Sequence, residues 1–140
     1  MTPKIIRKAE GRILIGGRQT IKLSSADTNK QMAKIYSVVP AGSGIPTHIH
    51  SLEDETFEIT GGELEVTING EVHVLEEGDV IFMPRDISHG FKAIKDTSMW
   101  VTLVPAGSEQ LFVEMAALPP GPPDMHKVSA IAEQYGIRFL

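Results

Sequence analysis

The sequence contains no cysteine. Disulfide bonds and thiolate ligands are therefore excluded, and any metal ion must be held by nitrogen and oxygen atoms. The first residues contain no apolar run long enough for a signal peptide or a membrane span. Because a lack of disulfides also fits a reducing compartment, we expect a cytoplasmic protein with no membrane partner.

Two further features exclude or disfavour whole classes of function. The sequence has no Gly-x-Ser-x-Gly motif and no Cys–His pair, so nothing indicates a covalent nucleophile. The net charge of −5 disfavours a nucleic-acid partner. Hydrophobic residues make up 41% and charged residues 22%, as in ordinary globular proteins. A length of 140 residues predicts one domain, 1–140.

Short strand patterns separated by turn signals fill most of the chain. Residues 63–68 alternate strictly between polar and apolar side chains, and Asn69-Gly70 is the strongest hairpin turn signal. Residues 24–30 are polar and predict a loop. Further strands are expected at 12–15, 19–23, 31–39, 55–60, 71–74, 80–83, 89–94 and 98–104.

The pattern changes after Pro105. Residues 108–116 predict a short helix with Ser108 as its N-cap. A stiff Pro/Gly-rich connector, 119–123, leads to a second helix that Asp124 can cap and Gly136 can end. Its apolar stripe predicts packing against the barrel or a second subunit. We therefore predict an all-β barrel or double-sheet jelly roll with a core at about 30–105 and a helical extension at about 108–136.

The strand pattern also predicts which side chains face the barrel interior. The alternation places apolar residues of several strands on one converging face. The expected inner-face residues are Phe57, Ile59, Leu64, Val66, Ile68, Val72, Val74, Phe91 and Trp100.

Two histidines, His48 and His50, lie one residue apart in an extended segment. Their side chains therefore point to the same side, with Cα atoms about 6.6–7 Å apart, and can converge on one metal ion. Glu53, Asp54 and Glu55 are candidate acidic ligands. Only Glu55 lies on the apolar face of the strand that follows, where an unpaired carboxylate would be costly. We expect Glu53 and Asp54 to lie in a solvated bend.

The other three histidines divide in the same way. His89 shares a face with Phe91 and is expected to point inward, whereas His73 and His126 are expected at the surface. The predicted metal site is therefore His48, His50, Glu55 and His89, inside an apolar cup that is open to a small molecule.

These residues resemble the two motifs of the cupin family. The first motif is matched at every position, by Gly42, His48, His50, Glu55 and Gly62. The second motif is matched by Gly78, Pro84 and His89, while Asp86 replaces a glycine and Ala93 replaces an asparagine. Neither replacement affects a ligand position. The connector and residues 131–137 also resemble single-domain bacterial cupins similar to quercetin 2,3-dioxygenase.

The resemblance implies a double-stranded β-helix, usually a homodimer, with one divalent transition metal ion on three histidines and one glutamate. Iron, manganese, nickel, cobalt, copper and zinc all suit these ligands. It further implies a metal-dependent dioxygenase that acts on a flavonol-like or other enolisable aromatic molecule, with Glu55 as general base. Two alternatives remain. One is a non-catalytic or regulatory small-molecule binder with a structural metal, and the other, ranked last, is a sugar isomerase or epimerase.

Overall fold

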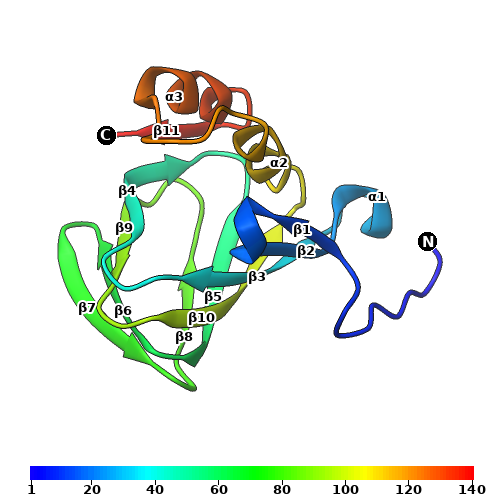
Figure 1. Ribbon diagram of the computed structural model, residues 1–140, viewed down its shortest axis with the longest axis horizontal. Coiled ribbons are helices and arrows are strands. Elements are labelled where there is room, and N and C mark those ends of the chain that lie inside the picture. Colours follow the sequence, from blue (N-terminus) through cyan, green and yellow to red (C-terminus); the bar gives the residue numbers. More distant parts are fainter.

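The computed structural model describes residues 1–140, which form two antiparallel sheets that pack face to face (Figure 1). The six-stranded sheet has the order β1 (Arg12–Leu14), β2 (Gln19–Leu23), β3 (Ala33–Val39), β10 (Thr97–Val104), β5 (Asp54–Gly61) and β8 (Val80–Met83). The five-stranded sheet has the order β11 (Ile137–Phe139), β4 (Gly44–His50), β9 (His89–Ala93), β6 (Glu63–Ile68) and β7 (Glu71–Glu76). This arrangement is a jelly roll and confirms the predicted all-β class.

The helices are few and short. A 3-10 turn (Ile15–Gly17) and α1 (Ser25–Thr28) lie near the N-terminus, and α2 (Gln110–Ala116) and α3 (Met125–Glu133) lie near the C-terminus. Figure 1 shows α2, α3 and β11 together at one end of the two sheets. None of these helices has the length and apolar character that crossing a membrane requires.

The main core lies between the sheets. Phe57, Ile59, Leu64 and Val66 are each at most 2% exposed, as the strand pattern predicts. Ile68 and Phe91 are partly buried against this core. Because the side chains of consecutive residues alternate between the faces of a strand, the inner faces of the two sheets become one apolar layer.

Val72 and Val74 were wrongly predicted to face inward. They are 59% and 53% exposed, because β7 is an edge strand whose register pairs them with the outward residues Thr67 and Glu65 of β6. Hydrophobic character alone therefore gave the wrong face for this strand. His73 lies opposite the buried Val66, yet half of its side chain is exposed at the sheet edge.

Trp100 was also wrongly predicted to face inward. Its neighbours Met99 and Val101 are buried, so the alternation of β10 turns the indole to the outer face. There the ring packs edge-on against Tyr36, with ring centroids 5.0 Å apart, and Lys34 Nζ lies 5.0 Å from the Trp100 ring.

Two local predictions need correction, and one strand was missed. Residues 24–30 contain α1, which a capping box between Ser24 and Asp27 stabilises. The helix predicted at 108–116 begins at Gln110, and Ser108 does not cap it. The strand β11 was not predicted, because a three-residue strand leaves little periodic pattern; it forms by pairing with β4.

Other local predictions are confirmed. The Asn69-Gly70 turn has positive φ at both residues, 49° and 82°, as a type I′ hairpin turn requires. The Asp124 side chain caps α3 by accepting hydrogen bonds from the backbone N–H groups of His126 and Lys127. The apolar stripe of α3 packs within the chain, where Ala132 joins Leu111 and Ile137 in a second small core.

Candidate metal centre

Three strands, two from one sheet and one from the other, bring the four predicted ligand residues together. The strand β4 supplies His48 and His50, β5 supplies Glu55 and β9 supplies His89, which pairs directly with His48 in the sheet register. All four residues are buried, between 2% and 7% exposed, and their candidate ligand atoms lie within 4.8 Å of one another. That these residues bind a metal ion stays a prediction.

The local backbone explains how His48 is placed. The pairing of β4 with β9 shifts in register between Ile45 and His48, where Pro46 cannot donate a ladder hydrogen bond. Gly44 permits this close approach of the two strands, because a Cβ atom there would lie 1.9 Å from Phe91 O. The irregularity frees the carbonyl of Pro46, which accepts a hydrogen bond from His48 Nδ1 at 2.7 Å.

The Nε2 atoms of the three histidines and the Glu55 carboxylate lie close together. His48 Nε2 lies 3.1 Å from His50 Nε2, and Glu55 Oε1 lies 3.1 Å from His89 Nε2 and 3.8 Å from His50 Nε2. On the opposite side of each ring, Nδ1 faces an acceptor: Pro46 O for His48, Glu53 Oε1 for His50 and, at 3.4 Å, Ile87 O for His89. In the tautomer with its proton on Nδ1, which metal binding requires, each ring presents its Nε2 lone pair to the space beside the Glu55 carboxylate. Without a metal ion, a proton on His89 Nε2 can be donated to Glu55 Oε1.

A cluster of acceptors without protons is unfavourable unless a cation lies between them. Neutral imidazole nitrogens and a carboxylate are ligands that divalent transition metals accept, and a hydrogen bond at the other nitrogen commonly fixes the ligating tautomer. The donor set and its hydrogen-bonded surroundings therefore fit a metal ion. His48, His50, Glu55 and His89 could hold one.

Glu53 is not in a solvated bend, contrary to the sequence prediction. It is 3% exposed, and its Oε1 accepts a hydrogen bond from His50 Nδ1 at 2.6 Å. The sequence does carry a signal for this contact, since Glu53 follows His50 by three residues across a tight bend. Glu53 faces the outer side of the imidazole and not the centre of the cluster, so it orients a candidate ligand.

Asp54 is engaged elsewhere. Its carboxylate accepts hydrogen bonds from the backbone N–H of Arg85 at 2.9 Å and from Arg85 Nε at 3.1 Å. These hydrogen bonds from Arg85 hold the pKa of Asp54 below its usual value. Asp54 is therefore partly exposed, as expected, but it lies in β5 and is paired with a guanidinium group.

The surroundings shift the pKa values of three cluster residues. Burial lowers the pKa of His48 to about 4, so this ring is neutral at pH 7. Burial also lowers the pKa of His50, but the hydrogen bond to Glu53 and the charge of Glu55 outweigh it, and the net shift is upward. Burial raises the pKa of Glu55, but His89 and the other histidines outweigh it, so Glu55 is ionised.

The backbone conformation of Asp86 explains why this residue can replace a glycine of the second cupin motif. Its φ is 67°, in the left-handed region that glycine adopts freely and that aspartate tolerates better than most residues. The bend therefore keeps a glycine-like shape. The backbone N–H of Asp86 donates a hydrogen bond of 2.7 Å to His50 O, which ties this bend to β4.

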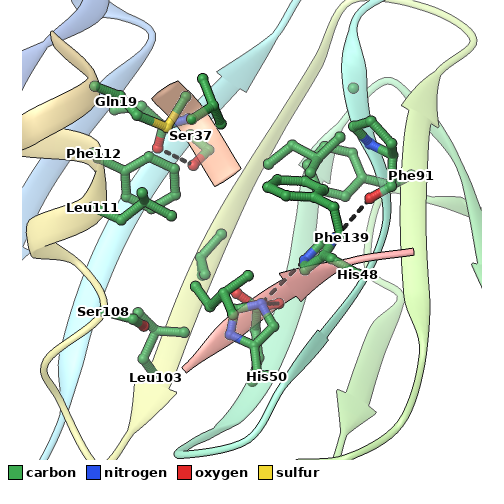
Figure 2. A pocket seen from close by; sticks show the side chains of 18 of the residues that line it. Gln19, Ser37, His48, His50, Phe91, Leu103, Ser108, Leu111, Phe112 and Phe139 are labelled. Atoms are coloured by element: carbon green, nitrogen blue, oxygen red, sulfur yellow. Dashed lines mark hydrogen bonds and ion pairs between the residues drawn. The ribbon is translucent and has the colours of Figure 1, made fainter. Parts of the chain in front are cut away.

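The cluster borders a cavity of about 180 Å³ (Figure 2). Of its 22 lining residues 13 are hydrophobic, and His48, His50 and Glu55 line it too. His89 is not among the lining residues and lies behind them. A metal ion held by the four residues would therefore meet the cavity on one side, where a small molecule could approach.

The C-terminal extension builds much of the cavity wall. Leu111 and Phe112 of α2, Val128 of α3 and Phe139 of β11 all line it. Figure 2 shows Leu111 and Phe112 on one side of the cavity, and Phe139 beside Phe91 on the other. The sequence predicted packing for this extension but gave no sign that it encloses the site, because that role depends on the unpredicted pairing of β11 with β4.

The remaining histidines lie apart from the cluster. His73 is half exposed and lies 3.6 Å from Glu71, and His126 is exposed on α3. The only group of at least three His, Cys, Asp or Glu side chains placed to hold a metal ion is the one formed by His48, His50, Glu55 and His89.

The comparisons with known proteins agree with this geometry. A family model described as a cupin domain matches residues 35–105, half of the chain. The chain therefore belongs to the cupin family, and the jelly roll described above is a cupin-type double-stranded β-helix. The matched region includes all four cluster residues and excludes the C-terminal extension.

Two curated proteins match part of the chain at low sequence identity. Quercetin 2,3-dioxygenase of Bacillus subtilis (strain 168) is 28% identical over 113 residues, which cover 79% of this chain and 34% of that protein. Protein SchB of Streptomyces halstedii is 32% identical over 60 residues, 43% of this chain and 44% of that protein. The matched part of this chain thus spans less than half the length of either curated relative.

A solved structure supports the fold. The RmlC-like cupin of Shewanella frigidimarina NCIMB 400 has a TM-score of 0.66 at 19% sequence identity, and the match covers 77% of this chain and 96% of that one. At this identity the likeness concerns the fold alone.

Proposed function

We propose that this cupin is a metal-dependent dioxygenase that acts on a flavonol-like or other enolisable aromatic molecule. The observation that carries the proposal is the convergence of three imidazole Nε2 atoms and one carboxylate at the wall of an apolar cavity. The similarity to the quercetin 2,3-dioxygenase of Bacillus subtilis supports this reaction class.

His48, His50, Glu55 and His89 would hold one divalent transition metal ion. When bound, such an ion supplies Lewis acidity and a template for the reacting molecules. Iron, manganese, nickel, cobalt, copper and zinc all suit three nitrogens and one oxygen, so the ligand set does not choose among them.

Glu55 is the residue placed to move a proton. It lines the cavity, and its lowered pKa keeps it ionised and ready to accept a proton from a bound hydroxyl group. The hydroxyl of an enol or a phenol is far more acidic than that of an aliphatic alcohol, so a carboxylate base can take its proton more readily. This difference favours an enolisable aromatic substrate.

The cavity supports the same class of ligand. Its apolar wall suits aromatic rings and limits the access of water to the reacting atoms. Its volume of about 180 Å³ lies below the roughly 300–1,000 Å³ of pockets that enclose drug-sized ligands. A one- or two-ring molecule therefore fits within it, and a three-ring flavonol fits if one end extends beyond it. The apolar wall disfavours a sugar isomerase or epimerase.

A non-catalytic small-molecule binder with a structural metal is the second candidate. The buried cluster and the apolar cavity would serve a binder equally well, because neither feature requires a reaction. The two candidates differ in oxygen consumption.

The test is oxygen uptake by protein reconstituted in parallel with iron, manganese, nickel, cobalt, copper and zinc, assayed with quercetin and simpler enolisable phenols. Rates are expressed per bound metal ion. Glu55→Gln removes the proton acceptor but keeps an amide oxygen at the ligand position, and Glu58→Gln on the exposed face of the same strand is the matched control.

We expect uptake that requires the metal, falls at least tenfold in Glu55→Gln per bound metal ion and is unchanged in Glu58→Gln. No uptake with any of these metals, in protein that holds one full equivalent, would reject the dioxygenase and favour the binder.

A further inference from the structure

Ser108 carries a buried hydroxyl group that no other protein atom satisfies. The residue is 5% exposed, and its Oγ is the only buried side-chain nitrogen or oxygen atom in the chain without a hydrogen-bond partner. Burial without a partner costs free energy, so native proteins pair nearly all such atoms, and an exception calls for an explanation.

The Ser108 hydroxyl group does not cap the helix that follows it, although a serine at this position commonly does. A serine just before a helix commonly accepts a hydrogen bond from the first turn. Here α2 begins without a side-chain cap, and Ser108 contributes only its carbonyl oxygen, which accepts from Leu111 N at 3.0 Å. Ser108 instead lines the cavity beside the candidate metal site, and it also lines a smaller pocket of about 90 Å³.

Neighbouring hydrogen bonds hold Ser108 in place. The fully buried Glu109 accepts hydrogen bonds from Gly107 N on one oxygen, and from Ser25 N and Ser25 Oγ on the other, all at 2.6 Å. The backbone on both sides of Ser108 is thereby fastened to α1. A hydroxyl group on such a support binds a ligand without the entropic cost of ordering a loop.

A second serine in the cavity wall shows the contrast. Ser37 Oγ donates a hydrogen bond of 2.7 Å to Gln19 Oε1, its direct partner in the pairing of β2 with β3. Figure 2 shows this pair beside Phe112, while Ser108 lies near Leu103, on the opposite side of Leu111. The Ser37 hydroxyl is satisfied within the protein, and the Ser108 hydroxyl is not.

We propose that Ser108 is a specificity-determining residue that hydrogen-bonds an oxygen function of the ligand in this cavity. This inference rests on the proposed function insofar as the ligand occupies the cavity beside His48, His50 and Glu55. The ligand class is then narrower than an enolisable aromatic. It is an aromatic molecule with a second hydroxyl or carbonyl group, separate from the oxygen atoms that face the metal site.

The experiment measures equilibrium binding to metal-loaded protein under nitrogen, so that no reaction takes place. The probes are 3-hydroxychromone, which has one enolisable hydroxyl next to a carbonyl group, and its derivatives with one additional hydroxyl at each free ring position. The variants are Ser108→Ala and, as a matched control, Ser98→Ala, which removes a hydroxyl bonded to Thr60 and outside the cavity wall.

We expect at least one dihydroxy derivative to bind the native protein more tightly than 3-hydroxychromone does. Ser108→Ala should weaken that derivative about threefold to tenfold, as for the loss of one hydrogen bond, and change 3-hydroxychromone less than twofold. Ser98→Ala should leave both affinities unchanged. If Ser108→Ala weakens no derivative selectively, or if no probe binds the native protein, the proposal is overturned.

Thermal unfolding gives an independent readout. Removing an unsatisfied buried hydroxyl group, which leaves the methyl side chain of alanine, should leave the Tm of ligand-free Ser108→Ala unchanged or raise it by a few degrees. Ser25→Ala should lower Tm, because it breaks a hydrogen bond to a buried carboxylate. A fall in the Tm of Ser108→Ala would reveal a structural partner and overturn the proposal. Binding that depends on Ser108 without any oxygen uptake would reject only the dioxygenase.

Discussion

Glu53 Oε1 lies 2.6 Å from His50 Nδ1, and both residues are buried. The contact fixes the proton of His50 on Nδ1 and turns Nε2 toward the other cluster residues. Hydrogen bonds of this kind orient histidine ligands and raise their basicity. The acidic residue nearest in sequence to the His-x-His pair therefore serves the site from outside the ligand cluster.

Replacing Glu53 should weaken metal binding although Glu53 is not a predicted ligand. Glu53→Ala should lower the affinity for the metal about 10- to 100-fold, because His50 loses the group that orients it. Glu53→Gln should lower it less, since its amide oxygen can still accept from Nδ1. Competition with a chromophoric chelator measures both, and Asp54→Asn, whose carboxylate pairs with Arg85, is the control. Equal affinities in native protein and Glu53→Ala would contradict this role.

The ligand assignment is tested by metal content. His50→Ala and Glu55→Ala should each lower the bound metal sharply while the barrel stays folded, because the core between the sheets does not include these side chains. His73→Ala and His126→Ala should leave the metal content unchanged, since both residues are exposed. Elemental analysis after dialysis gives the metal content, and circular dichroism monitors folding. Loss of metal in His73→Ala but not in His89→Ala would show that the fourth ligand is misassigned.

The convergence of the cluster could be predicted because it depends on strand parity and on two motifs within 42–93. Glu55 follows the alternation of β5, and His89 shares the parity of its strand, so local pattern and position agree. Parity failed for Val72 and Trp100, where the apolar side chain lies on the outer face. Which side chains of a strand face the core depends on its register with the neighbouring strand. That register cannot be derived from the sequence of one strand alone.

Long-range pairing accounts for what the sequence did not reveal. Glu53 and Ser108 line a small pocket together with Gln134 and Tyr135, so their positions depend on how the extension packs, and the pairing of β11 with β4 holds the extension in place. A three-residue strand and a serine before a helix both have ordinary local interpretations. The homodimer and the cytoplasmic location stay predictions, and light scattering on the purified protein would test the first.

Asp86 offers a test of backbone strain near the site. Because its φ is 67°, Asp86→Ala should destabilise the protein by about 1 kcal/mol, since alanine is strained in the left-handed region. Asp86→Gly should lie within about 1 kcal/mol of the native protein, because easier access to this conformation is offset by the larger entropy of the unfolded chain. Urea unfolding measures both. Equal stability of Asp86→Ala and Asp86→Gly would contradict the strain argument.

The Tyr135 hydroxyl, just after the end of α3, donates a hydrogen bond to Glu114 Oε2 of α2, and this bond should make stability depend on alkaline pH. The hydrogen bond to Glu114 raises the pKa of Tyr135 from 10.0 to about 12. The folded state thus holds the proton more tightly than the unfolded state does. The stabilisation is fully present below pH 10 and is lost as the pH rises from about 10 to about 12.

We therefore expect the Tm of the native protein to fall more steeply between pH 10 and 12 than the Tm of Tyr135→Phe, which has no hydroxyl proton to lose. Tyr36→Phe removes the only other tyrosine and isolates the absorbance change of Tyr135 for a direct titration. Since α2 and α3 both line the cavity, loss of this bond should also loosen the wall that faces the metal site. Parallel Tm profiles for native protein and Tyr135→Phe would show that the bond to Glu114 adds no stability.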